Sequence, residues 1–271
     1  MFKKYFKLGL FTLIYIIPIY IKLKNNNIKK ISAFKFLNWR NGYCYFKGMY
    51  LEKEVFVKID LKMHLLSNDI LVYDLCKDVM KDDLVEILHY SLDSKIEFVV
   101  YEFFNSNELD ENILLNELKY LDDIFRILNN LSKVGIIHRD IKLNNFLVSR
   151  GKLKIIDFTF SNSNTHKDFK EVDVDNSYNC FLLEFLGAGL NPSPFFWDDY
   201  YSFCTILKKL EKDANDFQKV KLNACIKEIE KFIGKTEYSI QCGTQYYFFI
   251  RQLKIKIKEL LRIDHKYKVL S

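Results

Sequence analysis

The pattern of apolar positions divides the chain into a strand-rich first part and a helix-rich second part. In the first part, short runs of aromatic and β-branched residues are separated by turn residues, which is typical of β-strands. Strands are expected at Ile31–Leu37, Tyr43–Tyr50, Val55–Asp60, Leu84–Ser91 and Lys95–Tyr101. One helix is expected among them, at Ser67–Met80, because Ser67, Asn68 and Asp69 can each cap its first turn.

In the second part the apolar spacing becomes helical. Asn116–Lys133 carries a stripe of apolar residues on one face, and Gly135 stands where a glycine commonly ends a helix. Further helices are expected at Phe195–Leu210, Asp216–Ile233 and Tyr246–Ile263. The sequence therefore predicts an α+β fold, in which a small antiparallel β part with one helix precedes a larger α-helical part.

The polar groups most suited to chemistry lie in one stretch, Gly135–Phe160. Here Asp140, Lys142, Asn145 and Asp157 stand between apolar runs that resemble short buried strands. Phosphoryl transfer from ATP needs a carboxylate to orient the attacking hydroxyl, a cation on the γ-phosphate and two oxygen ligands for Mg²⁺. The four side chains can supply these parts in the order in which they occur.

Two motifs in this stretch resemble those of a known family. His138-Arg139-Asp140-Ile141-Lys142-Leu143-Asn144-Asn145 resembles the catalytic loop of the protein-kinase superfamily. Asp157-Phe158-Thr159 resembles its metal-binding motif, with Thr where the family usually has Gly. The resemblance implies a two-lobed kinase fold, with an amino-terminal segment and linker at 1–30, the small lobe at 31–102 and the large lobe at 103–271.

The resemblance also implies a role for each residue of these motifs. Asp140 is expected to orient the acceptor hydroxyl and take its proton, and Lys142 to stabilise the phosphoryl group in transfer. Asn145 and Asp157 are expected to hold Mg²⁺. His138 and Phe158 are expected to pack beneath the site.

ATP binding is expected to involve the small lobe and the hinge. Val55-Phe56-Val57-Lys58-Ile59 resembles the strand whose lysine contacts the α- and β-phosphates, and Glu102-Phe103-Phe104 corresponds to the hinge whose backbone receives adenine. Gly42 is the one glycine where the family has its glycine-rich phosphate loop. Lys58 needs a carboxylate partner on the helix at Ser67–Met80, which contains no Glu. Asp74 is the best-placed substitute, with Asp69 and Asp78 as rivals.

The remaining matches to the family concern the activation segment and its surroundings. Ser161–Asn179 corresponds to this segment, and a phosphate on Ser161, Ser163, Thr165 or Ser177 could pair with Arg139. The alternative is that backbone carbonyls or acidic side chains already satisfy Arg139. Asp199 is expected to anchor the catalytic-loop backbone, with Asp198 as the alternative. Gly187–Pro194 stands where the family has its A-P-E motif, and it does not match.

The amino-terminal apolar run, Leu8–Ile21, has lysines on both sides and a polar stretch, Lys24–Lys30, after it. It has no small-residue cleavage site of the signal-peptide type, and it is short for a membrane-spanning helix. Two alternatives stay open: a helix at the membrane interface, with anionic lipid near the lysines, or a helix packed on the small lobe.

Composition narrows the class of protein further. The chain has 271 residues, of which 49% are hydrophobic and 28% charged, so it can form a core and is not of the disordered class. Six cysteines without paired spacing predict reduced thiols in a cytoplasmic protein, with no disulfide framework or zinc site. The net charge of +6 does not by itself indicate nucleic-acid binding, and the oligomeric state is left open.

The acceptor hydroxyl separates three hypotheses. Lys two positions after the catalytic Asp is the pattern of Ser/Thr protein kinases, which favours a protein acceptor. The small size, the reduced glycine loop and the unmatched A-P-E motif resemble bacterial kinases of lipopolysaccharide-core sugars, which favours a glycan. The third hypothesis, a non-catalytic pseudokinase, is disfavoured because Lys58, Asp140, Asn145 and Asp157 are all present.

Overall fold

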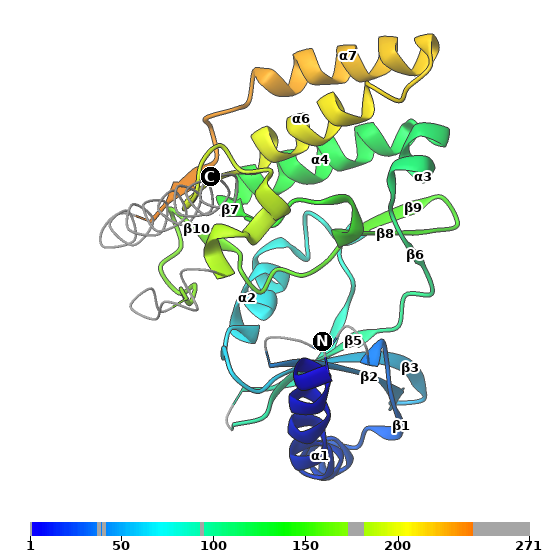
Figure 1. Cartoon of the computed structure of the whole chain (residues 1–271), viewed down its shortest axis with the longest axis vertical. Helices are drawn as coiled ribbons and strands as arrows, with labels where there is room; N and C mark the ends of the chain where they lie inside the picture. The colour runs from blue at the N-terminus through cyan, green and yellow to red at the C-terminus, as the bar shows by residue number, and fades with distance from the viewer. Residues whose placement is uncertain (1, 37–38, 40–41, 93–94, 173–181, 241–271) are drawn as a thin grey trace, which may run out of the picture.

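The computed structural model describes residues 2–36, 39, 42–92, 95–172 and 182–240. They form two lobes, with a β-sheet in the smaller lobe and bundled helices in the larger one (Figure 1). The small lobe's sheet has the strand order β1-β2-β3-β5-β4, and every neighbouring pair is antiparallel. Its strands are β1 (Lys29–Ala33), β2 (Tyr43–Tyr50), β3 (Lys53–Asp60), β4 (Ile87–Ser91) and β5 (Glu97–Glu102). The strands expected from the sequence are therefore all present, with shifted ends.

Two helices of the small lobe are described. Helix α2 (Leu66–Cys76) lies between the sheet and the large lobe, whereas α1 (Phe2–Asn25) lies on the side of the sheet that faces away from the large lobe (Figure 1). Ile19 and Leu23 of α1 are buried in the same cluster as Val57 and Phe98 of the sheet. The carboxyl-terminal half of α1 is thus part of the small-lobe core, which is the second of the two alternatives for this segment.

The expected polar linker at Lys24–Lys30 is wrong. Helix α1 continues to Asn25, Asn27 then takes the left-handed conformation with φ 62°, and the Ile28 amide donates to the Leu23 carbonyl at 3.1 Å. This backbone geometry is a common way to end a helix, and the buried Ile28 returns the chain directly to β1. The small lobe consequently includes part of the segment that we expected to precede it. No helix in the described residues is long and apolar enough to cross a membrane.

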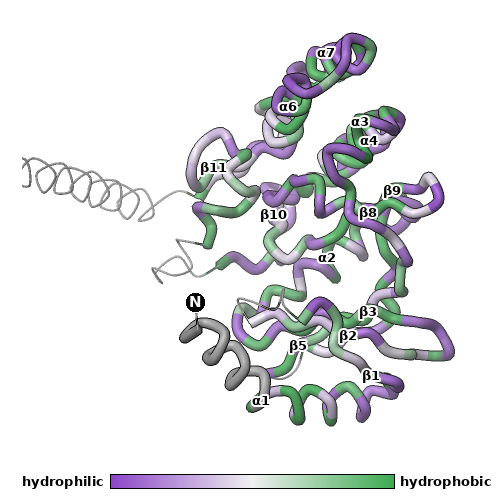
Figure 2. Tube along the Cα trace, turned by 45° about the vertical axis from the view of Figure 1, so that its right-hand side comes forward, coloured by the Kyte–Doolittle hydropathy of each residue, from purple (hydrophilic) through white to green (hydrophobic). Residues whose placement is uncertain are grey.

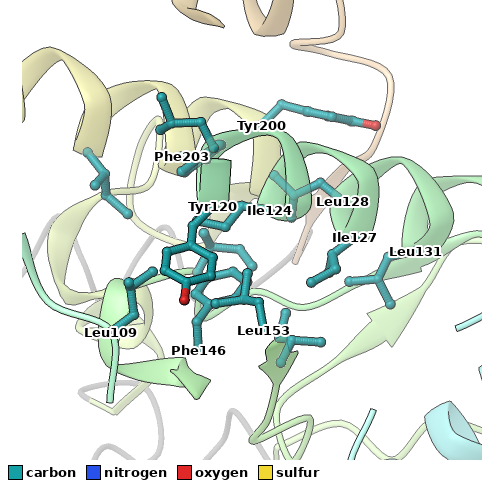
Figure 3. Packing of buried hydrophobic residues seen from close by; sticks show 14 of the residues in the cluster. Leu109, Tyr120, Ile124, Ile127, Leu128, Leu131, Phe146, Leu153, Tyr200 and Phe203 are labelled. Carbon is teal, nitrogen blue, oxygen red and sulfur yellow. The ribbon is translucent and has the colours of Figure 1, made fainter. Parts of the chain in front are cut away.

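Helices with both apolar and polar residues make up much of the described part of the large lobe (Figure 2). They are α3 (Glu111–Asn116), α4 (Lys119–Val134), α6 (Asp199–Leu210) and α7 (Asp216–Glu230). Ile124 and Leu128 of α4 pack with Phe203 of α6 in the core, above Phe146 and Leu153 (Figure 3). The expected glycine stop is present, because Gly135 has φ 77° and its amide donates to Leu131 and Ser132.

Two expected helices begin later than predicted, and one cannot be compared. The segment before Lys119 forms the separate helix α3. Phe196–Asp198 forms strand β11, paired with β12 (Glu237–Ser239), and the Asp198 carboxylate caps α6. The cap explains why the helix starts at Asp199. The helix expected at Tyr246–Ile263 lies outside the described residues.

Short strands fix the ends of the central stretch. Strand β7 (Ile136–Ile137) pairs with β10 (Asn162–Ser163), and β8 (Phe146–Ser149) pairs with β6 (Asn107–Glu108) and β9 (Lys152–Ile155). The short 3₁₀ helix η2 (Leu143–Asn145) precedes β8, and η3 (Leu186–Gly189) lies further along the chain. The loop after β7 and the turn after β9 are therefore held next to each other.

Candidate active site

A cavity of about 640 Å³ is lined by residues of both lobes. This volume is in the range of small-molecule sites in proteins. Its lining residues include many that the sequence analysis selected, among them Lys58, Asp69, Glu102, Phe104, Lys142, Asn145, Asp157 and Phe158. The fold thus brings the small-lobe lysine, the hinge and the two central motifs to one cavity.

Lys58 on β3 is the cationic group on the small-lobe side of this cavity. Its Nζ lies 2.7 Å from Asp157 Oδ1 and 3.2 Å from Asp69 Oδ2, and it also donates to the hydroxyl of Thr159. Burial alone lowers the pKa of Lys58, but the carboxylates of Asp157 and Asp69 outweigh it and raise the pKa well above the ordinary value. Lys58 is therefore held as a cation.

The expected partner of Lys58, Asp74, is wrong, and the rival Asp69 is in contact. Asp74 lies five positions further along α2, which is about 140° around a helix at 3.6 residues per turn. It consequently points outward, where its half-exposed side chain pairs with Lys77 at 2.8 Å. Asp69 stands in the first turn of α2, where its buried carboxylate also accepts the Phe158 amide at 3.0 Å.

Asp157 is the anionic group opposite Lys58. Burial alone raises the pKa of its carboxyl group, but the charge and hydrogen bond of Lys58, with further help from Lys142 and His138, lower it to about 2. The carboxylate is therefore ionised at any physiological pH. The next residue, Phe158, packs on the His138 ring with centroids 4.8 Å apart, as expected for residues beneath the site.

Asp140 lies at the centre of the catalytic loop. Its Oδ2 accepts Lys142 Nζ at 2.6 Å and Asn145 Nδ2 at 3.0 Å, and its Oδ1 accepts the Gly187 amide at 2.8 Å. Gly187 has φ 76°, and an added Cβ there would meet Asn191 at 2.8 Å, so this approach needs a glycine. A residue outside the central motifs therefore helps to orient the Asp140 carboxylate.

The backbone of the catalytic loop is held by the start of α6. The amides of His138 and Arg139 donate to Asp199 at 2.7 and 3.0 Å, whereas Asp198 caps the helix. Burial of Asp199 raises its pKa to about 6, against the opposing effect of His138 and these two amides. His138 is itself fixed through Nε2, which lies 3.0 Å from the Ile156 carbonyl oxygen.

The side chain of Arg139 contacts an acid that the sequence analysis did not identify, Glu171. Both Glu171 carboxylate oxygens lie 2.9 Å from Arg139 Nη1, and the guanidinium packs 4.0 Å above the Trp197 ring. Tyr238 donates to the same carboxylate at 3.0 Å. Of the two alternatives for Arg139, the structure has the one in which an acidic side chain pairs with it, through Nη1, while Nε and Nη2 have no hydrogen-bond partner among the described residues.

The hydroxyls proposed as phosphate acceptors divide into three groups. Ser161 is fully buried, Ser163 and Thr165 bond to each other at 3.0 Å, and Ser177 lies outside the described residues. The only sequence signal for Glu171 was an acid within the expected activation segment, and several other acids stand near it.

We expect Glu171→Gln to destabilise the protein by about 1–3 kcal/mol, because the buried Arg139 loses its counter-charge but keeps a hydrogen-bond acceptor. Urea unfolding measures this change. Glu228→Gln is the matched control, since it removes an exposed pair with Lys231 at 2.6 Å and should cost under about 1 kcal/mol. Equal unfolding free energies in the two variants would contradict a structural role for Glu171.

The turn at Gly42, where we expect the phosphate loop, can be compared with the sequence prediction only in part. Residues 37–38 and 40–41 are outside the described residues, and Gly42 does not line the cavity. Gly42 has φ 88°, and a Cβ there would lie 2.5 Å from Lys62 Cβ, so the turn into β2 itself requires glycine. A contact between Gly42 and nucleotide stays a prediction.

Comparison with known proteins agrees with this geometry. Residues 21–247 match the family model described as "Protein kinase domain". The chain is 31% identical over 118 residues to the cell cycle protein kinase DBF2 of Candida albicans, which is 40% of this chain and 16% of that one. It is 33% identical over 97 residues to a probable serine/threonine-protein kinase of Encephalitozoon cuniculi, 36% of this chain and 17% of that one. A longer match, 27% identical over 219 residues, covers 70% of this chain and 50% of a probable serine/threonine-protein kinase of Dictyostelium discoideum.

These alignments span at most half the length of the relatives, but the family model covers most of the chain, including every residue that lines the cavity. The chain belongs to the protein kinase family.

Proposed function

We propose that this kinase transfers the γ-phosphate of MgATP to a Ser or Thr hydroxyl of a protein. The observation that carries the proposal is the convergence of Lys58, Lys142, Asn145 and Asp157 on one cavity, with Asp140 held directly behind it. The ammonium groups of Lys58 and Lys142 thus lie near the oxygens of Asn145 and Asp157, which can bind a metal ion, and near the carboxylate of Asp140. Phosphoryl transfer depends on this kind of fixed charge arrangement more than on covalent chemistry.

The donor set suits magnesium. The Asn145 amide group donates to Asp140, so its carboxamide oxygen is the atom left to bind a cation beside the Asp157 carboxylate. Mg²⁺ takes one or two such protein oxygens and completes its shell with phosphates and water. No group of three or more His, Cys, Asp and Glu side chains that could hold a metal occurs in the part of the chain described, and a magnesium site of this kind does not need one. When bound, the ion supplies positive charge to the phosphate oxygens.

The chain's own groups would then divide the remaining tasks. Lys58, kept as a cation by two carboxylates, binds the α- and β-phosphates, while the hinge residues Glu102 and Phe104 border the adenine end of the cavity. Asp140 orients the acceptor hydroxyl and accepts its proton. Lys142 lies 2.6 Å from Asp140 and also lines the cavity, so its ammonium can stabilise the phosphoryl group in transfer.

A protein acceptor is favoured over a glycan by two observations. Lys142 stands two positions after Asp140, which is the Ser/Thr-kinase pattern, and it contacts the Asp140 carboxylate. Two of the three named relatives are probable serine/threonine-protein kinases. The retained charges at the cavity disfavour a non-catalytic role.

The test is transfer from γ-labelled ATP and Mg²⁺ to three acceptor sets: peptide libraries with a single Ser, Thr or Tyr, generic protein acceptors, and lipopolysaccharide-core saccharides. We expect label on Ser or Thr peptides, dependent on Mg²⁺ and absent with the Asp140→Asn variant. Label on saccharides alone would replace the proposed acceptor. Label on none of them, with no ATP hydrolysis, would contradict the catalytic assignment.

We also infer that the outer face of α1 contacts a membrane surface. Ile14, Ile17 and Ile21 are 61%, 66% and 53% exposed on the side that does not pack on the sheet, and apolar residues recur along this half of the helix (Figure 2). Lys24 is exposed beside them. Apolar residues next to basic ones are typical of helices that lie in the membrane interface, where each basic residue adds about 1 kcal/mol near anionic lipid.

We expect Ile17→Glu with Ile21→Glu to abolish sedimentation with phosphatidylserine vesicles and to leave kinase activity unchanged. Truncation is a poor test, because the inner face of α1 belongs to the small-lobe core. Val220→Glu on α7, where the side chain is 71% exposed, is the matched control and should sediment like wild type. Wild-type protein that stays in the supernatant at all lipid concentrations would contradict the membrane contact.

A further inference from the structure

Thr159 stands where the family usually has a glycine, and its hydroxyl lies among three charged groups. The side chain is buried, with 1% of the residue exposed. Oγ1 lies 2.7 Å from Asp69 Oδ2 and 3.2 Å from Asp157 Oδ1, and it accepts a hydrogen bond from Lys58 Nζ. A hydroxyl can donate one hydrogen bond while it accepts others. Here it can donate to Asp69 and accept from Lys58 at the same time.

The hydroxyl of Thr159 bridges Asp69 and Lys58, and this bridge matters because the side chain of Asp69 is one methylene shorter than that of Glu. Its Oδ2 is 3.2 Å from Lys58 Nζ, compared with 2.7 Å for Asp157, so the direct pair is the longer of the two carboxylate contacts. Its other oxygen is used by the Phe158 amide at 3.0 Å. The hydroxyl of Thr159 therefore gives Asp69 a second path to the lysine, and a glycine could not.

The neighbouring residue holds this arrangement in place from the backbone side. Asn68 Nδ2 donates to the Thr159 and Lys170 carbonyls, both at 2.9 Å, and Asn68 Oδ1 accepts the Lys170 amide at 2.8 Å. The first turn of α2 is thus fastened both to the main chain of Thr159 and to the segment after it. Asn68 is 1% exposed, so these bonds are shielded from water.

We propose that Thr159 is a positioning residue, whose hydroxyl completes the Lys58–Asp69 pair and sets Lys58 for the nucleotide phosphates. This inference rests on the proposed function for the role of Lys58 toward ATP. It predicts that the Thr159 hydroxyl and the Asp69 carboxylate position Lys58 together. Either feature alone would leave Lys58 incompletely held.

The first test compares Thr159→Val with Thr159→Ser. Valine keeps the shape and removes the hydroxyl, so we expect KM for ATP to rise roughly tenfold or more, with a smaller change in kcat, as for the loss of a hydrogen bond to a charged group. Serine should return KM to near the wild-type value. Thr205→Val is the matched control, because it removes a hydroxyl bond of 2.9 Å to the Tyr201 carbonyl on α6, outside the cavity. If Thr159 had only a structural role, Thr159→Val would lower thermal stability and leave the ratio of KM to kcat unchanged.

The second test exchanges both residues. Asp69→Glu alone should crowd the Thr159 hydroxyl, and Thr159→Gly alone should leave the short acid without its bridge. The double variant Asp69→Glu with Thr159→Gly should bind ATP more tightly than either single variant, since the longer acid can reach Lys58 directly. Additive losses in the double variant would overturn the proposal.

A readout that does not depend on catalysis separates this inference from the proposed function. Labelling by an amine-reactive reagent, followed by mass spectrometry, reports how accessible the Lys58 amine is. Lys58 should be protected in wild type and in Thr159→Ser, and labelled several times faster in Thr159→Val. Equal protection in wild type and Thr159→Val would refute the role of the hydroxyl, whereas faster labelling in a protein that does not bind ATP would refute only the proposed function.

Discussion

Asp140→Asn lowers kcat by roughly 10²–10⁴-fold, the usual contribution of a positioned general base, and leaves the affinity for ATP close to that of wild type. The two effects separate because Asp140 does not line the cavity, although Lys142 and Asn145 link it to residues that do. Asparagine has nearly the same shape but carries no charge. Its amide group would also place a donor where Lys142 or Gly187 now donates to a carboxylate oxygen.

Steady-state kinetics and calorimetry with a non-hydrolysable ATP analogue measure these two effects. Asp123→Asn is the control, since it removes a carboxylate that bonds Arg126 at 3.0 Å on α4. A variant at Asp140 with kcat within about threefold of wild type would be incompatible with the assigned base.

Asp157→Asn should be at least as damaging to transfer and should also lower the stability of the protein. The substitution removes an oxygen ligand for Mg²⁺ and leaves the buried Lys58 ammonium with Asp69 as its remaining carboxylate contact. Thermal unfolding with and without MgATP measures both effects. Wild type should gain stability from MgATP, whereas the variant should start lower and gain little. A full MgATP-dependent gain in the variant would count against Asp157 as a metal ligand.

The pKa of Asp157 sets a pH dependence for this stabilisation. Because the folded-state pKa is lowered from 3.8 to about 2, its ionised form stabilises the folded protein at pH values above the unfolded pKa. The contribution is lost as the pH falls through this interval. A loss of activity between pH 7 and 5 must therefore come from other groups.

The sequence was most informative where the chemistry is local. Asp140, Lys142 and Asn145 lie within one loop, and their mutual contacts follow from that short spacing. The small-lobe strands were also predictable, because alternation and β-branched content are local signals. Both successes concern residues whose partners lie nearby in sequence or in a regular ladder.

The failures concern contacts that depend on how distant elements are oriented. Asp74 and Asp69 stand on one helix, and only the placement of α2 against β3 decides which of them reaches Lys58. Glu171 reaches Arg139 because of the path of a loop, which has no periodicity to reveal it. In the part of α1 from Ile14 to Leu23, one face lies in the core and the other is exposed, and the composition of the run could not separate the two.

The contact between Arg139 and Glu171 has a consequence for how the kinase can be controlled. A phosphate that pairs with such an arginine can be removed by a phosphatase, but a carboxylate encoded in the chain cannot. The contact between the loop at Arg139 and the segment at Glu171 is therefore encoded in the sequence. The contact forms when the chain folds, and no phosphorylation at this position is needed to give Arg139 a counter-charge.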